Sequence, residues 1–307
     1  MALEKIIFIL GPTAVGKTTV AYFLAQKIKG EIISCDSMQV YKEITIASNK
    51  PPDEILKKVP HHLINIVSVA ESFDVARFNQ LALEKIAQIH KKNHIPIIAG
   101  GSGLYAQILL DGIFEGRGEN GALREELRSL VKAKGADVLY AMLKEKDKDA
   151  ALKIHPHDVK KVIRALEVCL LEKQPISQLQ KKRSGLWGKF DMYLFVLNRP
   201  REQLYAQIDR RVDEMFAQGV VQEVETLLKK NISLTAQGFI GFSEIKDYLK
   251  GNYDLAQARY LMKRNTRHYA KRQLTWFRKD KRMTWIDIEN NVSYDDIACD
   301  IQKRIFG

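Results

Sequence analysis

The 307-residue chain contains few cysteines and no long apolar run. Its three cysteines, Cys35, Cys169 and Cys299, are far apart and form no Cys-x-x-Cys pair, so the sequence carries no disulfide framework. No apolar stretch reaches the ~18 residues that a membrane-spanning helix requires. The N-terminal residues lead directly into a strand-like run, so we expect no secretory signal. We therefore expect a cytoplasmic protein that makes no use of a membrane.

Acidic residues are also in the minority. The net charge is +12, from 49 Lys and Arg against 37 Asp and Glu. A kinase of small molecules has no need of this excess, whereas a protein that binds a polyanion does. The hydrophobic fraction of 46% supports a substantial core, and the length suffices for one large or two small domains.

The segment from Gly11 to Thr18 fits the phosphate-binding P-loop pattern G-x-x-x-x-G-K-[ST]. It follows an apolar run and precedes a helix-like segment, which is the context that the motif needs. Backbone N–H groups of such a loop point at an anion, and the helix N-terminus adds positive potential. We expect Lys17 to reach the outer phosphate and Thr18 to be the ligand of Mg²⁺. The expected diphosphate-binding residues are Gly11, Pro12, Thr13, Ala14, Val15, Gly16, Lys17 and Thr18.

Apolar strand-like runs alternate with helical patterns in much of the chain. We expect strands at 6–10, 31–35, 61–69, 95–99, 192–197 and 283–287, and helices at 19–29, 73–92 and 201–230. This order predicts an α/β fold with a P-loop NTPase-like parallel sheet flanked by helices. Ligands of such sheets bind beyond the carboxyl ends of the strands. The P-loop, Asp36 and Ser102 each follow such an end, so we expect them to converge on one crevice.

The middle of the chain has a different pattern. Residues 115–121 form a polar, glycine-rich break, and residues 122–179 are helical and charged without strand-like runs. We therefore expect an all-helical insertion domain at 115–189, and a core domain made of residues 1–114 and 190–307.

A basic helix is expected near the C-terminus. Ten Lys or Arg residues and a single acid, Asp280, lie between Arg259 and Arg282. A solvated helix normally mixes charge signs to gain pairs between residues four apart. Three aromatic residues that can pack or stack on bases are interleaved with the cations: Tyr260, Tyr269 and Trp276. We therefore favour contact with a nucleic acid over a merely solvated helix face.

Several short motifs follow one another along nearly the whole chain. After the P-loop come Asp-Ser-x-x-x-Tyr at 36–41, Pro-His-His-Leu at 60–63, Gly-Gly-Ser-Gly-Leu-Tyr at 100–105, His-Pro-His-Asp at 155–158 with Arg-Ala-Leu-Glu at 164–167, and Lys-Arg-Gln-Leu-Thr-Trp-Phe-Arg at 271–278. In this combination the sequence resembles the bacterial tRNA dimethylallyltransferases, also called tRNA isopentenyltransferases. The P-loop alone is generic and typical of ATP-binding proteins, whereas the later motifs in this order are specific.

The resemblance implies a prenyl transfer. A dimethylallyl group moves from dimethylallyl diphosphate to N6 of adenosine 37, next to the anticodon of a tRNA, and diphosphate leaves with the help of Mg²⁺. The P-loop then holds diphosphate rather than ATP, and Asp36 is the candidate base for the exocyclic amine. The catalytic residues implied in this way are Asp36, Ser102, Lys17, Thr18 and Arg211.

The resemblance also implies an RNA-binding surface on several segments. The insertion would clamp the anticodon stem-loop, and the target base must leave its stack to reach a buried pocket. We expect the protein to act as a monomer. The implied tRNA contacts are Asp36, Ser37, Met38, Gln39, Ser102, Arg124, Lys160, Lys161, Arg164, Lys271, Arg272, Gln273, Thr275, Trp276 and Arg278.

The sequence departs from the family pattern in two places. Ser102 stands where the family usually has threonine, so the hydroxyl is kept and a methyl group is lost. Lys160-Lys161 stands where the family often has Gln-Arg, which keeps the charge but loses planar, bidentate recognition. We expect phosphate contacts to survive this second change.

Three other functions fit part of the sequence. A P-loop kinase of small molecules explains the loop but not the basic helix. An adenylate isopentenyltransferase, which prenylates free AMP, ADP or ATP, shares the loop and Asp36 but has no use for a long cationic helix. A non-catalytic RNA-binding module leaves the intact Lys17, Thr18 and Asp36 unexplained.

Overall fold

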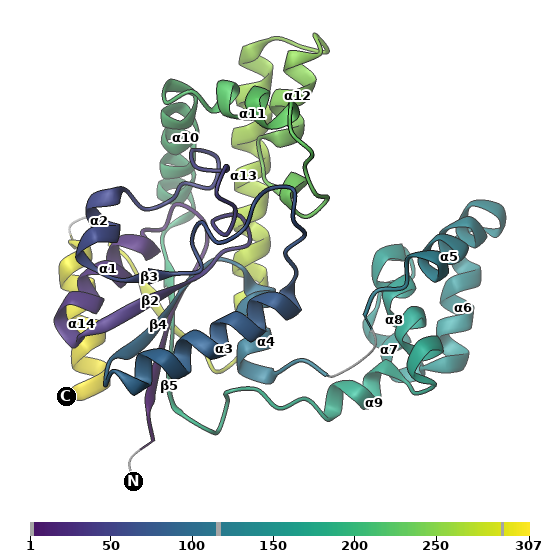
Figure 1. Cartoon of the computed structure of the whole chain (residues 1–307), viewed down its shortest axis with the longest axis horizontal. Helices are drawn as coiled ribbons and strands as arrows, with labels where there is room; N and C mark the ends of the chain where they lie inside the picture. Colours follow the sequence, from purple (N-terminus) through teal and green to yellow (C-terminus); the bar gives the residue numbers. More distant parts are fainter. Residues whose placement is uncertain (1–2, 115–117, 290–291) are drawn as a thin grey trace. The chain divides into compact units, whose positions relative to one another are not determined.

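The computed structural model describes residues 3–114, 118–289 and 292–307 (Figure 1). The chain divides into two compact units, one of residues 1–109 with 187–307 and one of residues 110–186. The insertion expected at 115–189 overlaps the second unit along most of its length. Part of the expected glycine-rich break, residues 115–117, lies outside the described residues.

A six-stranded sheet forms the centre of the first unit. Its order is β3-β2-β4-β1-β5-β6, and neighbouring strands run parallel, which confirms the expected α/β class. In β1, residues Ile6 to Leu10 are fully buried because β4 and β5 flank the strand and helices cover both faces. The strands are β1 (Lys5–Leu10), β2 (Gly30–Cys35), β3 (His61–His62), β4 (Ile95–Gly100), β5 (Asp191–Asn198) and β6 (Thr284–Asp287).

Helices cover this sheet and continue beyond the carboxyl ends of its strands. On one face Ile7 and Ile9 pack in a core with α1 and α14, and α3 lies along β2 and β4. Figure 1 shows α10, α11, α12 and α13 grouped beyond the strand ends. The helices of this unit are α1 (Lys17–Ile28), α2 (Asp53–Lys58), α3 (Val75–Lys91), α4 (Gly103–Asp111), α10 (Arg201–Ala217), α11 (Val220–Leu228), α12 (Phe242–Leu249), α13 (Leu255–Phe277) and α14 (Tyr294–Phe306).

The strand expected at 61–69 is mostly irregular. Only β3 forms at its start, because Leu63 and Asn65 adopt positive φ angles of 62° and 57° that interrupt extended backbone. Pairing resumes at a single bridge between Tyr41 and Val67. The prediction of one continuous strand was therefore wrong.

The long helix expected at 201–230 is two helices. Gly219 lies between α10 and α11 with a φ of 95°, a conformation that glycine adopts without strain. The sequence reading also missed α14, which begins in a capping box formed by Ser293 and Asp296.

All regular elements among the described residues of the second unit are helices, as its periodicity predicted. Leu139, Leu143 and Leu166 lie at the centre of its core. The buried Asp147 carboxylate accepts hydrogen bonds from the N–H groups of Ala150 and Ser177, which joins α7 to α9. The helices are α5 (Gly121–Lys134), α6 (Ala136–Lys146), α7 (Lys148–Lys153), α8 (Val159–Glu172) and α9 (Ile176–Lys181). In neither unit is a described helix long and apolar enough to cross a bilayer.

Candidate active site

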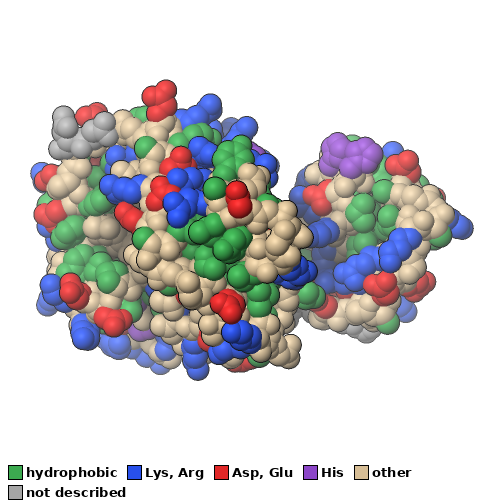
Figure 2. Space-filling model, turned by 90° about the horizontal axis from the view of Figure 1, so that it is seen from above, with side chains coloured by type: hydrophobic (Ala, Val, Ile, Leu, Met, Phe, Trp, Pro, Cys, Tyr) green, Lys and Arg blue, Asp and Glu red, His purple; other side chains and the backbone are tan. Residues whose placement is uncertain are grey.

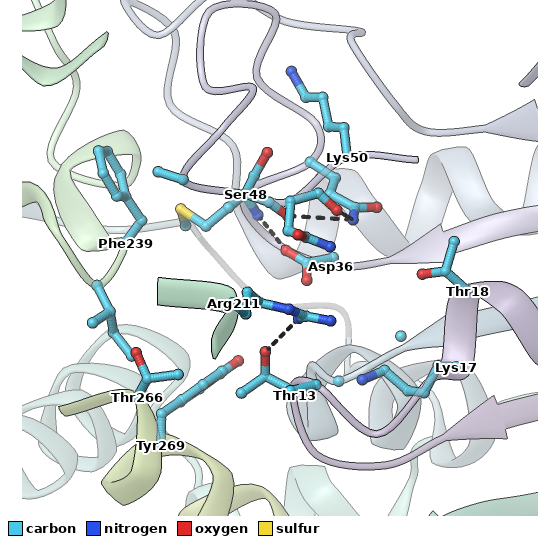
Figure 3. A pocket seen from close by; sticks show the side chains of 18 of the residues that line it. Thr13, Lys17, Thr18, Asp36, Ser48, Lys50, Arg211, Phe239, Thr266 and Tyr269 are labelled. Atoms are coloured by element: carbon cyan, nitrogen blue, oxygen red, sulfur yellow. Dashed lines mark hydrogen bonds between the residues drawn. The ribbon is translucent and has the colours of Figure 1, made fainter. Parts of the chain in front are cut away.

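A cavity of about 470 Å³ lies at the carboxyl ends of the strands in the first unit. The P-loop and the residues after β2 and β4 form its floor, while α10 and α13 contribute side chains to its wall. Figure 3 shows the Arg211 guanidinium between Asp36 and Thr13, with the Lys17 ammonium directed toward the same space. The expected convergence of the P-loop and Asp36 is therefore observed.

The P-loop connects β1 to α1 in a tight turn. Its Gly16 has a φ of 102°, and a Cβ atom there would collide with the Tyr294 ring of α14. Lys17 Nζ donates to the Pro12 carbonyl at 2.7 Å, so the ammonium is folded back over the loop. This arrangement presents loop N–H groups and a cation to one small volume, which suits a phosphate group.

Two of the cations that line the cavity, Lys17 and Arg211, are buried with little compensating negative charge. Burial and the neighbouring Arg211 charge lower the pKa of Lys17 to about 7. Burial also lowers the pKa of Arg211, whose Nη1 donates to Thr13 Oγ1 at 3.1 Å. Cations that are this poorly compensated gain from binding an anion. The pair therefore fits a ligand with several negative charges.

Asp36 follows β2 and lines the same cavity as these cations. One carboxylate oxygen, Oδ1, accepts the Met38 N–H at 2.8 Å, which fixes the orientation of the side chain. Thr18 also lines the cavity. Among the described residues no three His, Cys, Asp or Glu side chains lie close enough together to hold a metal ion.

Ser102 is not among the residues that line the cavity. It is half-buried, and its backbone N–H donates to the Cys35 carbonyl at 3.2 Å. Tyr269 does line the cavity, and its ring points inward in Figure 3. Burial, and to a lesser degree the Asp36 charge, raise the pKa of this phenol, which keeps it a neutral hydrogen-bond donor. The catalytic role of Ser102 stays a prediction.

Two glutamines predicted to contact RNA have their amides directed at the protein. Gln39 Oε1 accepts from Ser34 Oγ at 2.8 Å, while its Nε2 lies 3.4 Å from the Ser48 carbonyl. Gln273, only 6% exposed, accepts the Thr13 N–H and donates to the Gly101 carbonyl. Both glutamines also line the cavity, as do Ser37 and Met38.

The cations of α13 fall into two groups. Arg267 pairs with Asp209 at 3.3 Å and Lys263 with Asp213 at 2.7 Å, so α10 supplies acids that α13 itself lacks. Arg272 lines the cavity instead. Four further predicted RNA contacts on or just after this helix are exposed: Lys271, Thr275, Trp276 and Arg278. Figure 2 shows Lys and Arg side chains spread over the visible face of each unit, so the positive charge is not confined to α13.

The remaining predicted RNA contacts lie in the second unit. Arg124 forms two hydrogen bonds with the fully buried Glu167 carboxylate, each of 2.9 Å, and Arg164 pairs with the same group. Lys160 and Lys161 are exposed on the first turn of α8. Glu167 therefore fixes the two arginines, while the two lysines are exposed and Lys161 pairs with Asp158.

Sequence reasoning missed the groups that hold the loop at 45–52. The Glu223 carboxylate on α11 accepts three consecutive N–H groups, from Thr45, Ile46 and Ala47, at 2.8 to 2.9 Å. Lys50 Nζ donates to the Tyr41 carbonyl at 2.6 Å, and burial lowers the pKa of this lysine to about 8. Local sequence patterns do not predict such contacts, because Glu223 is far from the loop in the sequence.

The parallel sheet and the Gly-rich turn at Lys17 define a P-loop protein, a class whose members bind phosphate groups at this turn. The family model described as IPP transferase matches residues 39–280. The chain is 39% identical over 305 residues to a tRNA dimethylallyltransferase of Geobacter sulfurreducens, covering 99% of this chain and 97% of that protein. It is 40% identical over 307 residues to that of Alkaliphilus oremlandii, covering 99% and 98%.

Solved structures agree with these matches. The tRNA isopentenylpyrophosphate transferase of Bacillus halodurans is 37% identical with a TM-score of 0.72, covering 98% of this chain and 97% of that chain. A eukaryotic dimethylallyltransferase acting on tRNA is 31% identical with a TM-score of 0.81, covering 97% and 77%. The chain belongs to the tRNA dimethylallyltransferase family.

Proposed function

We propose that this protein transfers a dimethylallyl group from dimethylallyl diphosphate to N6 of adenosine 37 in tRNA and releases diphosphate. The observation that carries the proposal is one cavity that holds a P-loop, two poorly compensated cations and a carboxylate, beside a helix with exposed cations. The P-loop and the two cations suit the diphosphate leaving group, the carboxylate suits the acceptor amine, and the exposed cations of the helix suit RNA.

The leaving diphosphate is the group that the cations stabilise. As the carbon–oxygen bond breaks, negative charge grows on the diphosphate oxygen. Lys17, Arg211 and the N–H groups of the P-loop lie where they can stabilise this charge, and they cost little reorganisation because the fold already holds them. Stabilisation of this kind favours the transition state over the bound substrate.

Asp36 is the base in this proposal. The adenine amine is a weak nucleophile because its lone pair is delocalised into the ring. The Asp36 carboxylate removes the N6 proton as the new carbon–nitrogen bond forms, a contribution of about 10² to 10⁴ in rate. The hydrogen bond from Met38 fixes the carboxylate before substrate arrives.

Magnesium fits the oxygen donors of this site. Mg²⁺ commonly binds through one or two protein oxygens together with substrate phosphates and water. The Thr18 hydroxyl would hold the ion against the diphosphate, in line with the P-loop pattern. When bound, the ion neutralises part of the charge on the leaving group.

The RNA-binding side of the proposal rests on exposed cations in each unit. Lys271 and Arg278 would contact phosphates of the anticodon stem-loop, and the exposed Trp276 offers a ring for a base. Lys160 and Lys161 would add phosphate contacts from the helical unit, which acts as the clamp on the stem-loop. We further propose a monomer that works in the cytoplasm.

Parallel transfer assays test this function. Radiolabelled dimethylallyl diphosphate and Mg²⁺ are incubated with unmodified tRNA and with AMP, and the label in each acceptor is counted. Label in tRNA alone is expected. Label in AMP alone would assign the chain to the adenylate isopentenyltransferases, and ATP turnover without prenyl transfer would make it a kinase.

A further inference from the structure

Gln273 occupies a position in α13 that the family resemblance assigns to RNA contact, yet its amide binds two backbone groups of the protein at the edge of the cavity. Its Oε1 accepts the Thr13 N–H of the P-loop at 2.8 Å, and its Nε2 donates to the Gly101 carbonyl at 2.9 Å. The side chain is 6% exposed. One buried amide therefore joins three segments that are distant in sequence: the P-loop, the turn after β4, and α13.

The glycines after β4 make room for this contact. A Cβ atom on Gly101 would collide with the Gln273 amide nitrogen, and one on Gly103 would collide with the Trp276 ring. Residues 273 and 276 are three apart and lie on neighbouring positions of one helix face. The glycines at 101 and 103 therefore pack against Gln273 and Trp276, and α13 approaches the end of β4 at this contact.

Thr13 is held from two directions. Its N–H binds Gln273, and its Oγ1 accepts from Arg211 on α10 at 3.1 Å. The ion pairs of Arg267 and Lys263 with acids of α10 hold the two helices together. The position of a P-loop residue therefore depends on both helices, and the P-loop must keep its shape for its N–H groups to converge on an anion.

We propose that Gln273 is a positioning residue of the diphosphate cradle and not an RNA-reading residue. The inference rests on the proposed function in taking dimethylallyl diphosphate as the ligand of the P-loop. Without the amide, a partly buried N–H at Thr13 and a buried carbonyl at Gly101 both lose their partner. The P-loop then relaxes away from the geometry that binds diphosphate, while the exposed cations of α13 stay in place.

The test compares Gln273→Met with Gln257→Met. Methionine keeps the volume of glutamine and removes both hydrogen bonds, and Gln257 is an exposed residue on the same helix. Dimethylallyl diphosphate with Mg²⁺, and separately an anticodon stem-loop RNA, are titrated into the full chain by calorimetry. Gln273→Met is expected to weaken diphosphate binding about tenfold and to leave stem-loop affinity within about twofold, and Gln257→Met to change neither.

The opposite pattern would overturn the proposal. If Gln273→Met weakens stem-loop binding and leaves diphosphate binding intact, the residue reads RNA; unchanged affinity for both ligands would also refute the positioning role. Should Gln273→Met fail to fold, Gly101→Ala tests the same contact because its methyl group displaces the amide. That variant is expected to weaken diphosphate binding and to leave stem-loop affinity within about twofold, whereas unchanged diphosphate binding would refute the positioning role. If both variants fold, their losses are expected to be non-additive when combined, and additive losses would contradict a shared contact.

The proposed function can fail without this inference failing. A wild-type protein that binds dimethylallyl diphosphate but moves no label to tRNA disproves prenyl transfer. The effect of Gln273→Met on diphosphate affinity still decides the positioning role, since that titration contains no RNA.

Discussion

The charge state of Lys17 predicts how diphosphate binding depends on pH. In the free site the pKa of this lysine is about 7, because burial and Arg211 disfavour the ammonium. A bound diphosphate favours the ammonium and raises this pKa, so binding takes up a proton whenever the free site is partly neutral. Uptake is expected to be about 0.5 proton at pH 7 and about 0.9 at pH 8.

The same linkage fixes the trend in affinity. Above pH 7 the affinity for dimethylallyl diphosphate falls, with a limiting slope of about tenfold per pH unit until the pKa of the bound state is reached. The terminal phosphate itself titrates near pH 6, so it contributes little to this trend. In Lys17→Arg the guanidinium stays protonated throughout, and the affinity is expected to be nearly flat over the same range.

Calorimetry measures both quantities. Dimethylallyl diphosphate is titrated into the protein with Mg²⁺ and without tRNA, from pH 6.5 to 8.5, in two buffers of different ionisation enthalpy. The difference between the buffers gives the number of protons taken up. Uptake that is absent in the wild-type protein, or equal in Lys17→Arg, would refute the assignment of the titrating group to Lys17.

Three further predictions follow from the site and its supports. Asp36→Ala should lower prenyl transfer by about 10² to 10⁴ while diphosphate affinity changes only a few-fold, and turnover within a few-fold of wild type would exclude Asp36 as the base. Glu223→Gln should lower kcat/KM by about tenfold, because the three N–H groups that shape the cavity loop lose a charged acceptor; unchanged steady-state kinetics would contradict this role. Burial alone would raise the pKa of Glu31, but hydrogen bonds from His62, Lys92 and His94 outweigh it and hold this pKa at about 2. Since folding depresses this pKa, the ionised carboxylate stabilises the folded state fully above about pH 4.5, and this stabilisation disappears as the pH falls toward 2. In urea unfolding, Glu31→Gln should lower the free energy of unfolding by about 3 kcal/mol at pH 7, and by less below pH 4.5. A loss of stability that is independent of pH would contradict this prediction.

The sheet was predictable because its signals are local. Ile6 to Leu10 is an unbroken apolar run, which is what a strand buried on both faces requires, and the P-loop follows it directly. Asp36 could be placed in the same crevice because parallel strands end at one edge of the sheet. These inferences need only the spacing of residues along the chain.

The errors arose where backbone conformation or distant contacts decide. The positive φ angles of Leu63 and Asn65 end β3 early although the residues themselves look strand-like. Gly219 divides the expected long helix because its φ is 95°, whereas an isolated glycine is often tolerated within a helix.

Hydrogen bonds between residues that are distant in the sequence also cannot be predicted from local sequence patterns. Glu223 binds a loop more than 170 residues earlier in the chain, and the partners of Gln273 are separated from it by more than 170 residues as well. The motif around Gln273 was interpreted as an RNA contact from resemblance alone. Its buried amide, bound to the P-loop and to the turn after β4, supports the positioning role proposed above.

The measurement that tests the central claim most directly is prenyl transfer to two anticodon stem-loop RNAs that differ only at position 37. One carries adenosine there and the other guanosine, which lacks the N6 amine. With radiolabelled dimethylallyl diphosphate and Mg²⁺, label is expected in the adenosine RNA alone. Equal label in both RNAs would contradict transfer to N6 of adenosine 37, and label in neither, from an enzyme that binds both substrates, would contradict prenyl transfer itself.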